Sequence, residues 1–241
     1  MSQFLHFSVN KELFNDSYNW NYWHPSDSER VELGTVRGLD VALPFHFHEE
    51  DQLTFVLSGR RRFVIGNMQQ DIPSGFGIHI SHGTPHRSLS DVADLVCINM
   101  YLTPNAYEIN ELLMGLKRLW QRKYCISRLD IVVLAAQCRK SDIPALSPDR
   151  RIYIEPDAAI GHAAQLASMS REGFSRRFKK LYGMPPQAYQ VMTKLNNARR
   201  LLRIGEPLAA VSAEAGFADQ SHMGRHFLRF FGITPGLYRL R

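Results

Sequence analysis

The sequence lacks long apolar runs and is poor in cysteine, and both absences narrow the class of protein. No stretch approaches the roughly 18 uninterrupted apolar residues that a membrane helix needs. The N-terminus, MSQFLHFSVNKELFND, has no basic segment followed by an apolar core, so no secretion signal is expected. The three cysteines, Cys97, Cys125 and Cys138, are odd in number and match no zinc spacing. We expect a cytoplasmic protein with reduced thiols and no membrane partner.

Acidic residues are also scarce, but only in the C-terminal third. From Ala158 to the end, 13 Lys and Arg stand against 4 Asp and Glu, a net charge of +9, whereas the remainder carries −3. A surface with this excess of positive charge suits a polyanion, and double-stranded DNA is the obvious one. The 241 residues suffice for two small domains, each with its own core.

The basic third contains a segment that occurs twice, 49 residues apart. Residues 159–189 return as residues 208–238, which places Arg176 on Arg225, and Gly183 on Gly232. Each copy reads as a short helix, a tight turn and a second helix. One such hairpin would be unremarkable among helical proteins, but two copies with the same buried and basic positions favour a pair of helix-turn-helix motifs, at residues 159–182 and 208–231.

The second helix of each copy combines an apolar face with a polar, basic one. Ser170 is placed to cap the first of these helices. The predicted inward residues are Phe174, Phe178 and Leu181 in the first copy and Met223, Phe227 and Phe230 in the second. Residues 187–204 form one predicted connecting helix, which would hold the two motifs near one DNA turn, roughly 34 Å, apart.

The N-terminal part has the texture of a β domain. Between residues 29 and 102, apolar and polar residues alternate between glycine turns, which predicts a small antiparallel barrel or sandwich. Two amphipathic helices follow within residues 106–137. They could pack on the barrel or form a dimer face, and we favour a homodimer formed through the first helix. The predicted division is a ligand-sensing domain at 1–138, a Ser- and Pro-rich linker at 139–149 and a DNA-binding domain at 150–241.

Histidines gather in two segments of the predicted barrel. His46 and His48 lie two apart, on the same side of a strand, and His86 follows a glycine turn. These three could be metal ligands, but the nearby Gln52 is a poor anionic ligand and a good hydrogen-bonding group for a neutral small molecule. We therefore expect no metal and no cofactor, and an organic effector held by His46, His48, Gln52, His86 and Arg62, with Arg61 as the alternative to Arg62.

The C-terminal motifs identify a family resemblance. The run NNARRLLRIGEPLAAVSAEAGFADQSHMGRHFLRFFGITPGLYR resembles the C-terminal motif of AraC/XylS transcription regulators, and HFHEEDQLTFVLSG with HGTPHRS resembles their cupin-like sensor domain. The resemblance implies an α+β protein: a cupin-like antiparallel β-barrel with following helices, then an all-α domain with two helix-turn-helix motifs joined by a connector helix. The DNA contacts it implies are Arg171, Glu172, Ser175, Arg176, Lys179, Lys180, Gln220, Ser221, His222, Arg225 and Arg229.

Three functions compete on these residues. The favoured one is a sequence-specific regulator, an activator rather than a repressor, that responds to a small molecule and is not an enzyme. The second is a cupin metalloenzyme with a DNA-binding tail, and the third is a non-specific DNA binder. Glu172 places a negative charge at the DNA-facing side of the first motif, so the second motif is expected to carry more of the specificity.

Overall fold

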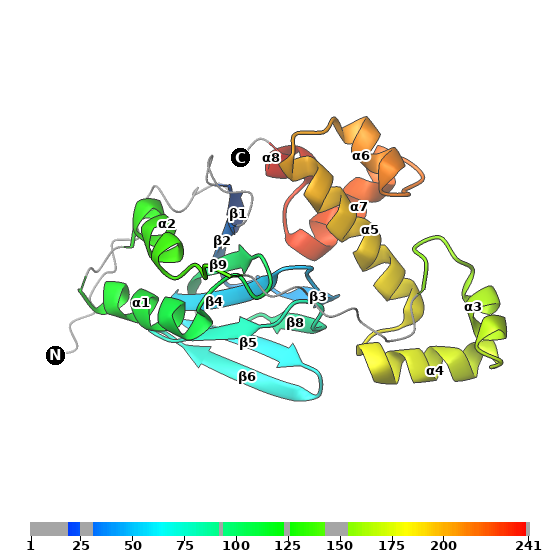
Figure 1. The fold of residues 1–241 in the computed structure, drawn as a ribbon, viewed down its shortest axis with the longest axis horizontal. Coiled ribbons are helices and arrows are strands. Elements are labelled where there is room, and N and C mark those ends of the chain that lie inside the picture. Colours follow the sequence, from blue (N-terminus) through cyan, green and yellow to red (C-terminus); the bar gives the residue numbers. More distant parts are fainter. Residues whose placement is uncertain (1–18, 25–30, 92–93, 123–125, 143–153, 240–241) are drawn as a thin grey trace.

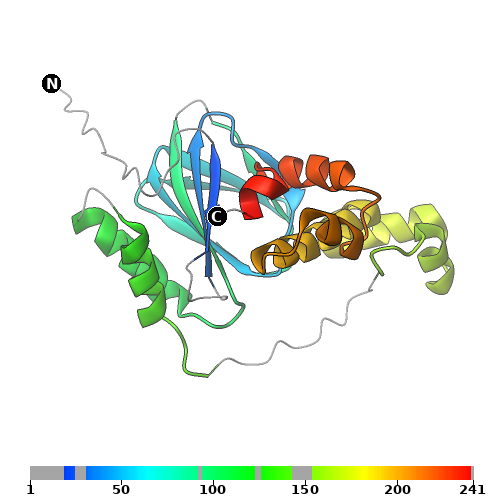
Figure 2. The same cartoon turned by 90° about the horizontal axis from the view of Figure 1, so that it is seen from above.

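A computed structural model of the chain describes residues 19–24, 31–91, 94–122, 126–142 and 154–239. Cys125 and most of the predicted linker lie outside these residues. The described part consists of two antiparallel sheets, two helices on one side of them and six helices on the other (Figures 1 and 2). We call residues 19–142 the β domain and residues 154–239 the helical domain. No helix in the described ranges is long and apolar enough to cross a membrane.

Nine strands form the β domain. They are β1 (Trp20–Trp23), β2 (Val31–Gly38), β3 (Leu43–His46), β4 (Asp51–Ser58), β5 (Arg60–Ile65), β6 (Met68–Pro73), β7 (Gly77–Ile80), β8 (His86–Leu89) and β9 (Leu95–Leu102). One sheet has the order β1-β2-β9-β4-β7 and the other β3-β8-β5-β6. Every pairing among them is antiparallel, which confirms the predicted all-antiparallel β domain.

The five-stranded sheet is covered on both faces. Along β9, Cys97 and Tyr101 belong to the core that the sheets and the helical domain share, whereas Ile98 and Met100 belong to a second core. Helices α1 (Ile109–Arg122) and α2 (Arg128–Gln137) cover that second core. The predicted helices at 106–137 therefore exist and pack on the sheet, although α2 leaves Leu129 exposed.

The helical domain contains α3 (Ile160–Leu166), α4 (Arg171–Tyr182), α5 (Pro186–Arg203), α6 (Leu208–Glu214), α7 (Gln220–Phe231) and α8 (Pro235–Arg239). The sequence repeat is reproduced closely: α4 and α7 begin 49 residues apart and have 12 residues each. Both end at a glycine in the left-handed region, Gly183 and Gly232, each with φ 71°. The predicted pair of helical hairpins joined by one long helix, α5, is thus confirmed.

The helical domain is docked on the β domain through an apolar core. Tyr22 of β1 donates a hydrogen bond from its hydroxyl to the carbonyl of Phe231 at 2.9 Å. Phe47 stacks on Tyr189, with ring centroids 4.9 Å apart, and residues of both domains form one hydrophobic cluster. Helices α5, α7 and α8 therefore sit against the sheets, and α3 and α4 lie farthest from them (Figures 1 and 2).

Candidate nucleic-acid interface and histidine cluster

Helix α4 presents the first group of predicted DNA contacts. Ser170 caps it as predicted, since its Oγ accepts a hydrogen bond from the backbone N–H of Gly173 at 3.1 Å. Phe178 and Tyr182 are buried and stack with ring centroids 4.1 Å apart. Leu181 is 43% exposed, so its predicted inward position was wrong. The next buried residue after Phe178 is Tyr182, four positions along the helix, and not Leu181, three positions along.

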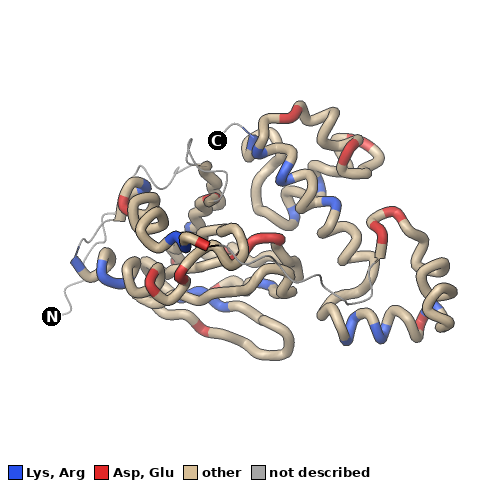
Figure 3. Tube along the Cα trace, viewed as in Figure 1, with Lys and Arg blue, Asp and Glu red and all other residues tan. Residues whose placement is uncertain are grey.

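The opposite face of α4 is open to solvent. Figure 3 shows its basic residues along the helix. Ser175 is half-buried, and the other predicted contacts are exposed: Arg171, Glu172, Arg176, Lys179 and Lys180. The structure therefore leaves the predicted set accessible to a ligand.

Helix α7 presents the second group. Asp219, a cap that the sequence reading missed, accepts a hydrogen bond from the backbone N–H of His222 at 2.6 Å. His222 is half-buried, and its Nε2 lies 3.1 Å from Nε2 of His226. Burial and the neighbouring His222 lower the pKa of His226. The remaining predicted contacts of this helix are exposed: Gln220, Ser221, Arg225 and Arg229.

These two surfaces offer chemistry suited to duplex DNA. Arginine can pair with the O6 and N7 edge of guanine, and glutamine with adenine. Basic residues later on each helix, such as Lys179 and Arg229, suit phosphate contacts that position the domain. Contact with DNA by these residues stays a prediction.

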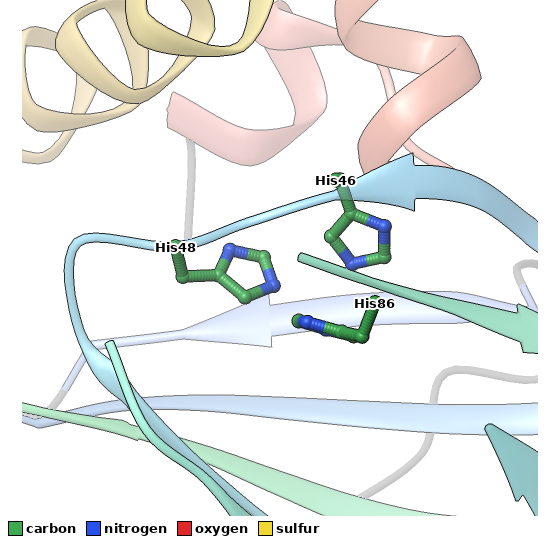
Figure 4. Close-up of side chains that lie close together, drawn as sticks. All are labelled: His46, His48 and His86. Carbon is green, nitrogen blue, oxygen red and sulfur yellow. The ribbon is translucent and has the colours of Figure 1, made fainter. Parts of the chain in front are cut away.

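The three barrel histidines form a second, buried site. His46 ends β3 and is the register partner of His86 at the start of β8, and His48 follows two residues after His46. The ring centroids of His46 and His86 are 4.3 Å apart, and that of His48 lies 4.9 and 5.4 Å from them. Figure 4 shows the three rings turned toward one another. The structure thus brings together the histidines that the sequence singled out.

Backbone carbonyls fix which nitrogen of two rings is free. Nδ1 of His46 lies 2.7 Å from the carbonyl of Pro44, and Nδ1 of His86 lies 2.8 Å from that of Thr84. A carbonyl only accepts, so Nδ1 of each ring carries the hydrogen. Burial lowers the pKa of His86 to about 4 and that of His46 well below its ordinary value, so both rings are neutral at pH 7. Nε2 of each therefore presents a lone pair.

Gln52 places a third lone pair in the same site. Its Oε1 lies 3.1 Å from Nε2 of His86, and its Nε2 donates to Oγ1 of Thr54 at 3.0 Å. The Thr54 hydroxyl in turn donates to Oδ1 of Asn99 at 2.6 Å, which leaves it free to accept from Gln52. Two acceptors thus face each other in a buried site, an arrangement that repels unless a cation or a proton lies between them.

The resemblance to cupin-like domains implies a metal, and the arrangement of these residues shows whether they could hold one. In the described part of the chain, His46, His48 and His86 are the group of His, Cys, Asp or Glu residues whose ligand atoms converge, within 4.8 Å of one another. Neutral imidazole nitrogens and an amide oxygen suit zinc, iron, nickel or copper. The donor set fits a divalent transition-metal ion, which if bound would act as a Lewis acid or as a structural centre.

Arg62 does not join the cluster. It lies at 3.4 Å from Asp91 and donates to the carbonyl of Ser90. Arg61, the alternative considered from the sequence, is the arginine that points inward; it is 2% exposed and donates to the carbonyl of Val41 at 3.0 Å. Because alternate residues of a strand face opposite sides, burying Arg61 turns Arg62 outward.

Sequence reasoning missed a buried ion-pair network at the domain boundary. We call it the interdomain clamp: Glu32 and Glu50 of the β domain with Arg199, Arg203 and Tyr238 of the helical domain. Arg199 lies 2.6 Å from Glu32 and 3.1 Å from Glu50. Arg203 lies 2.6 and 2.5 Å from the same two carboxylates, and the Tyr238 hydroxyl donates to Glu32 at 2.5 Å.

The clamp is electrostatically balanced. The side chains of Arg199 and Glu32 are each 1% exposed. Burial alone would raise the pKa of Glu32, but Arg199 and Arg203 outweigh it and hold the pKa at about 2. Removing either partner would leave a buried charge without compensation, which costs about 3–5 kcal/mol.

Comparison with known proteins identifies the helical domain. Residues 163–241 match a family of helix-turn-helix domains. The RCS-specific HTH-type transcriptional activator RclR of Escherichia coli K12 is 37% identical over 90 residues, which are 34% of this chain and 31% of that protein. A putative AraC-like transcription regulator of Streptomyces antibioticus is 33% identical over 81 residues, 33% of this chain and 27% of that protein. The helical domain is therefore similar to the helix-turn-helix domains of AraC-like transcription regulators.

Two further comparisons extend beyond the helical domain. The probable transcriptional regulator LumQ of Photobacterium leiognathi is 21% identical over 236 residues, 85% of this chain and 95% of that protein. Fatty-acid-bound ToxT of Vibrio cholerae strain SCE256 has a TM-score of 0.51 at 10% identity, over 90% of this chain and 97% of that chain. This last likeness shows the fold alone. The two antiparallel sheets and the helices that follow them confirm the predicted α+β architecture.

Proposed function

We propose that this protein is an AraC-type, sequence-specific DNA-binding transcriptional regulator whose β domain binds an effector. The observation that carries the proposal is the matched pair α4 and α7: two helices with the same length, the same glycine end and exposed basic faces. The relatives matched over the helical domain are named as transcriptional regulators, and RclR as an activator. The chain matches only about a third of the length of those two proteins, so partner and effector belong to the proposal.

The paired helices support recognition of two adjacent groove segments. Helix α5, of 18 residues, links the two motifs in one rigid element. Lys194 of α5 pairs with Asp157 and donates to the carbonyl of Gly216 at 2.7 Å, which ties the connector to the start of the domain and to the second hairpin. One helical domain is therefore expected to bind one asymmetric DNA site. We further propose that the protein acts in the cytoplasm and activates transcription from that site.

The first test is selection of bound fragments from bacterial genomic DNA by the purified chain in moderate salt. Arg225→Ala should lose its preference for the selected site by about 1–3 kcal/mol, since one bidentate base contact is removed. Arg239→Ala is the matched control, because Arg239 is exposed and basic but lies on α8, outside the predicted contacts. Random recovered DNA, with Arg225→Ala behaving like the parent, would reject site-specific regulation in favour of non-specific binding.

The buried histidine cluster supports one rival, a metalloenzyme with a DNA-binding tail. Its donor set fits a transition-metal ion, as described above. The rival requires turnover that disappears when His86 is replaced by alanine. A regulator instead shows no turnover, and the same substitution alters its DNA binding or the response of that binding to the effector.

A further inference from the structure

Arg199 lies between the histidine cluster and the interdomain clamp. Its Nη1 lies 3.3 Å from Nδ1 of His48 and 3.1 Å from Glu50, while its Nη2 lies 2.6 Å from Glu32. The guanidinium also stacks over the ring of Tyr101, 4.3 Å from its centroid. One buried side chain of the helical domain therefore contacts both a histidine of the cluster and the two carboxylates of the interdomain clamp.

The hydrogen bond from Arg199 sets the state of His48. A guanidinium only donates, so Nδ1 of His48 accepts and its hydrogen lies on Nε2. That Nε2 is buried and has no hydrogen-bond partner among the residues described. It points toward His46 and His86 (Figure 4). In this arrangement His48 offers the cluster an N–H group, whereas His46 and His86 offer lone pairs.

A metal ion in the cluster would need the opposite arrangement. A neutral imidazole has one lone pair, so a ring that ligates through Nε2 carries its hydrogen on Nδ1. That N–H would then face the N–H groups of Arg199, donor against donor. The charge of a divalent ion one ring away from the guanidinium adds a repulsion of the same sense. Ligation of His48 and engagement of Arg199 therefore exclude each other.

We propose that Arg199 couples occupation of the cluster of His46, His48, His86 and Gln52 by a divalent transition-metal ion to the docking of the helical domain. Metal binding displaces Arg199 from His48, strains its bonds to Glu32 and Glu50, and loosens α5 from the β domain. By reciprocity, whatever frees Arg199 tightens metal binding. The proposal rests on the proposed function in one respect: it assumes that docking of the helical domain controls DNA binding.

The test uses the full chain, without an affinity tag, and Co²⁺ as the metal. Visible absorption measures stoichiometry and affinity, and hydrogen–deuterium exchange of α5 and α8 measures docking. His222→Ala is built into every protein, because the half-buried pair His222 and His226 could itself chelate a metal. We expect one Co²⁺ per chain, loss of binding in His86→Ala, and faster exchange of α5 and α8 only when Co²⁺ is bound.

Two substitutions of Arg199 separate this coupling from structural damage. Arg199→Lys keeps the charge but shortens the donor, and Arg199→Gln removes both charge and reach. Each should bind Co²⁺ more tightly than the parent, Arg199→Gln by about tenfold, whereas a merely structural role predicts weaker or unchanged binding. Arg200→Gln is the control, because Arg200 is exposed and donates a hydrogen bond to Asn197, which lies outside the interdomain clamp.

Three results would overturn the proposal: no stoichiometric Co²⁺, unchanged exchange on binding, or equal affinity in parent and both Arg199 variants. None of these measurements involves DNA. If the metal results hold while genomic selection recovers random DNA, the coupling stands and the regulatory function fails.

Discussion

Arg199 and His48, 151 positions apart in the chain, meet at 3.3 Å between Nη1 and Nδ1 across the domain boundary. The contact joins the buried histidines of the β domain to the helix that connects the two helix-turn-helix motifs. The same guanidinium is 1% exposed and paired with Glu32. A change at the cluster therefore has a direct physical route to the placement of α5.

The clamp is expected to stabilise the whole chain. Glu32→Gln removes the carboxylate shared by Arg199, Arg203 and Tyr238 and should lower the free energy of unfolding by about 3–5 kcal/mol. Urea denaturation followed by tryptophan fluorescence measures it. Asp71→Asn, at an exposed position of β6, is the control and should change it little. An equal, small effect of both substitutions would mean that the clamp is not stabilising.

The same carboxylate predicts a dependence on pH. The pKa of Glu32 is held at about 2, against 4.5 for the free side chain, so between these values the unfolded chain binds a proton that the folded chain does not. Its stabilisation is complete above about pH 5 and is lost as the pH falls toward 2, a total of about 3 kcal/mol. The charged or titratable groups that interact with it are His24, Glu50, Arg199, Arg203, Tyr22, Tyr101 and Tyr238.

Parallel urea titrations of the parent and Glu32→Gln at several pH values check this dependence. The difference in unfolding free energy between them should shrink steadily from pH 5 to pH 2.5. A difference that stays constant over this range would contradict the assigned role of Glu32.

Gly232 is expected to tolerate no side chain. It has φ 71°, and a Cβ there would lie 2.3 Å from Cδ1 of Trp20. Gly232→Ala should therefore lose about 3 kcal/mol of stability through backbone strain and overpacking. Gly205→Ala separates the two causes, because Gly205 has φ 86° with open space around it and should lose only about 1 kcal/mol. A similar loss of stability in both variants would show that the Trp20 side chain moves aside at little cost in free energy.

Glu172 should weaken DNA binding by the parent protein. It is exposed on the first turn of α4, among the predicted contacts, and its charge repels phosphate. Glu172→Gln should raise affinity for all DNA sequences a few-fold, about 1 kcal/mol, with a steeper dependence on salt. Fluorescence anisotropy with specific and random duplexes measures it, and Asp71→Asn serves as control. Unchanged affinity would place Glu172 away from the duplex.

The predicted dimer face is now placed on α2 instead of α1, because α1 buries Leu112 and Leu116 whereas α2 exposes apolar residues. Leu129 is 70% exposed and Val133, one turn later, is 46% exposed. Sedimentation should show a dimer for the parent and a monomer for Leu129→Glu, because a buried charge opposes association. Leu166→Glu on α3, at a position 76% exposed, should remain dimeric. A monomeric parent would end this prediction.

The local signals of the helical domain were legible in the sequence. The 49-residue repeat correctly predicted α4 and α7. The signals that mark these helices are apolar spacing, the Ser170 cap and the glycines at 183 and 232, and each of them acts over only a few residues. The alternation of the β domain was readable for the same reason. The prediction that Leu181 points inward was wrong, because the last turn of α4 buries the next residue, Tyr182, instead.

The sequence by itself determined the two folds, the repeated hairpins and the convergence of His46, His48 and His86. Only the tertiary structure decided that Arg199 is buried, that it pairs with Glu32, and that Arg61 rather than Arg62 points inward. The physical reason is that a charged residue on a helix is expected in solvent unless a partner from elsewhere compensates it. That partner lies 167 positions away, beyond the reach of any local pattern.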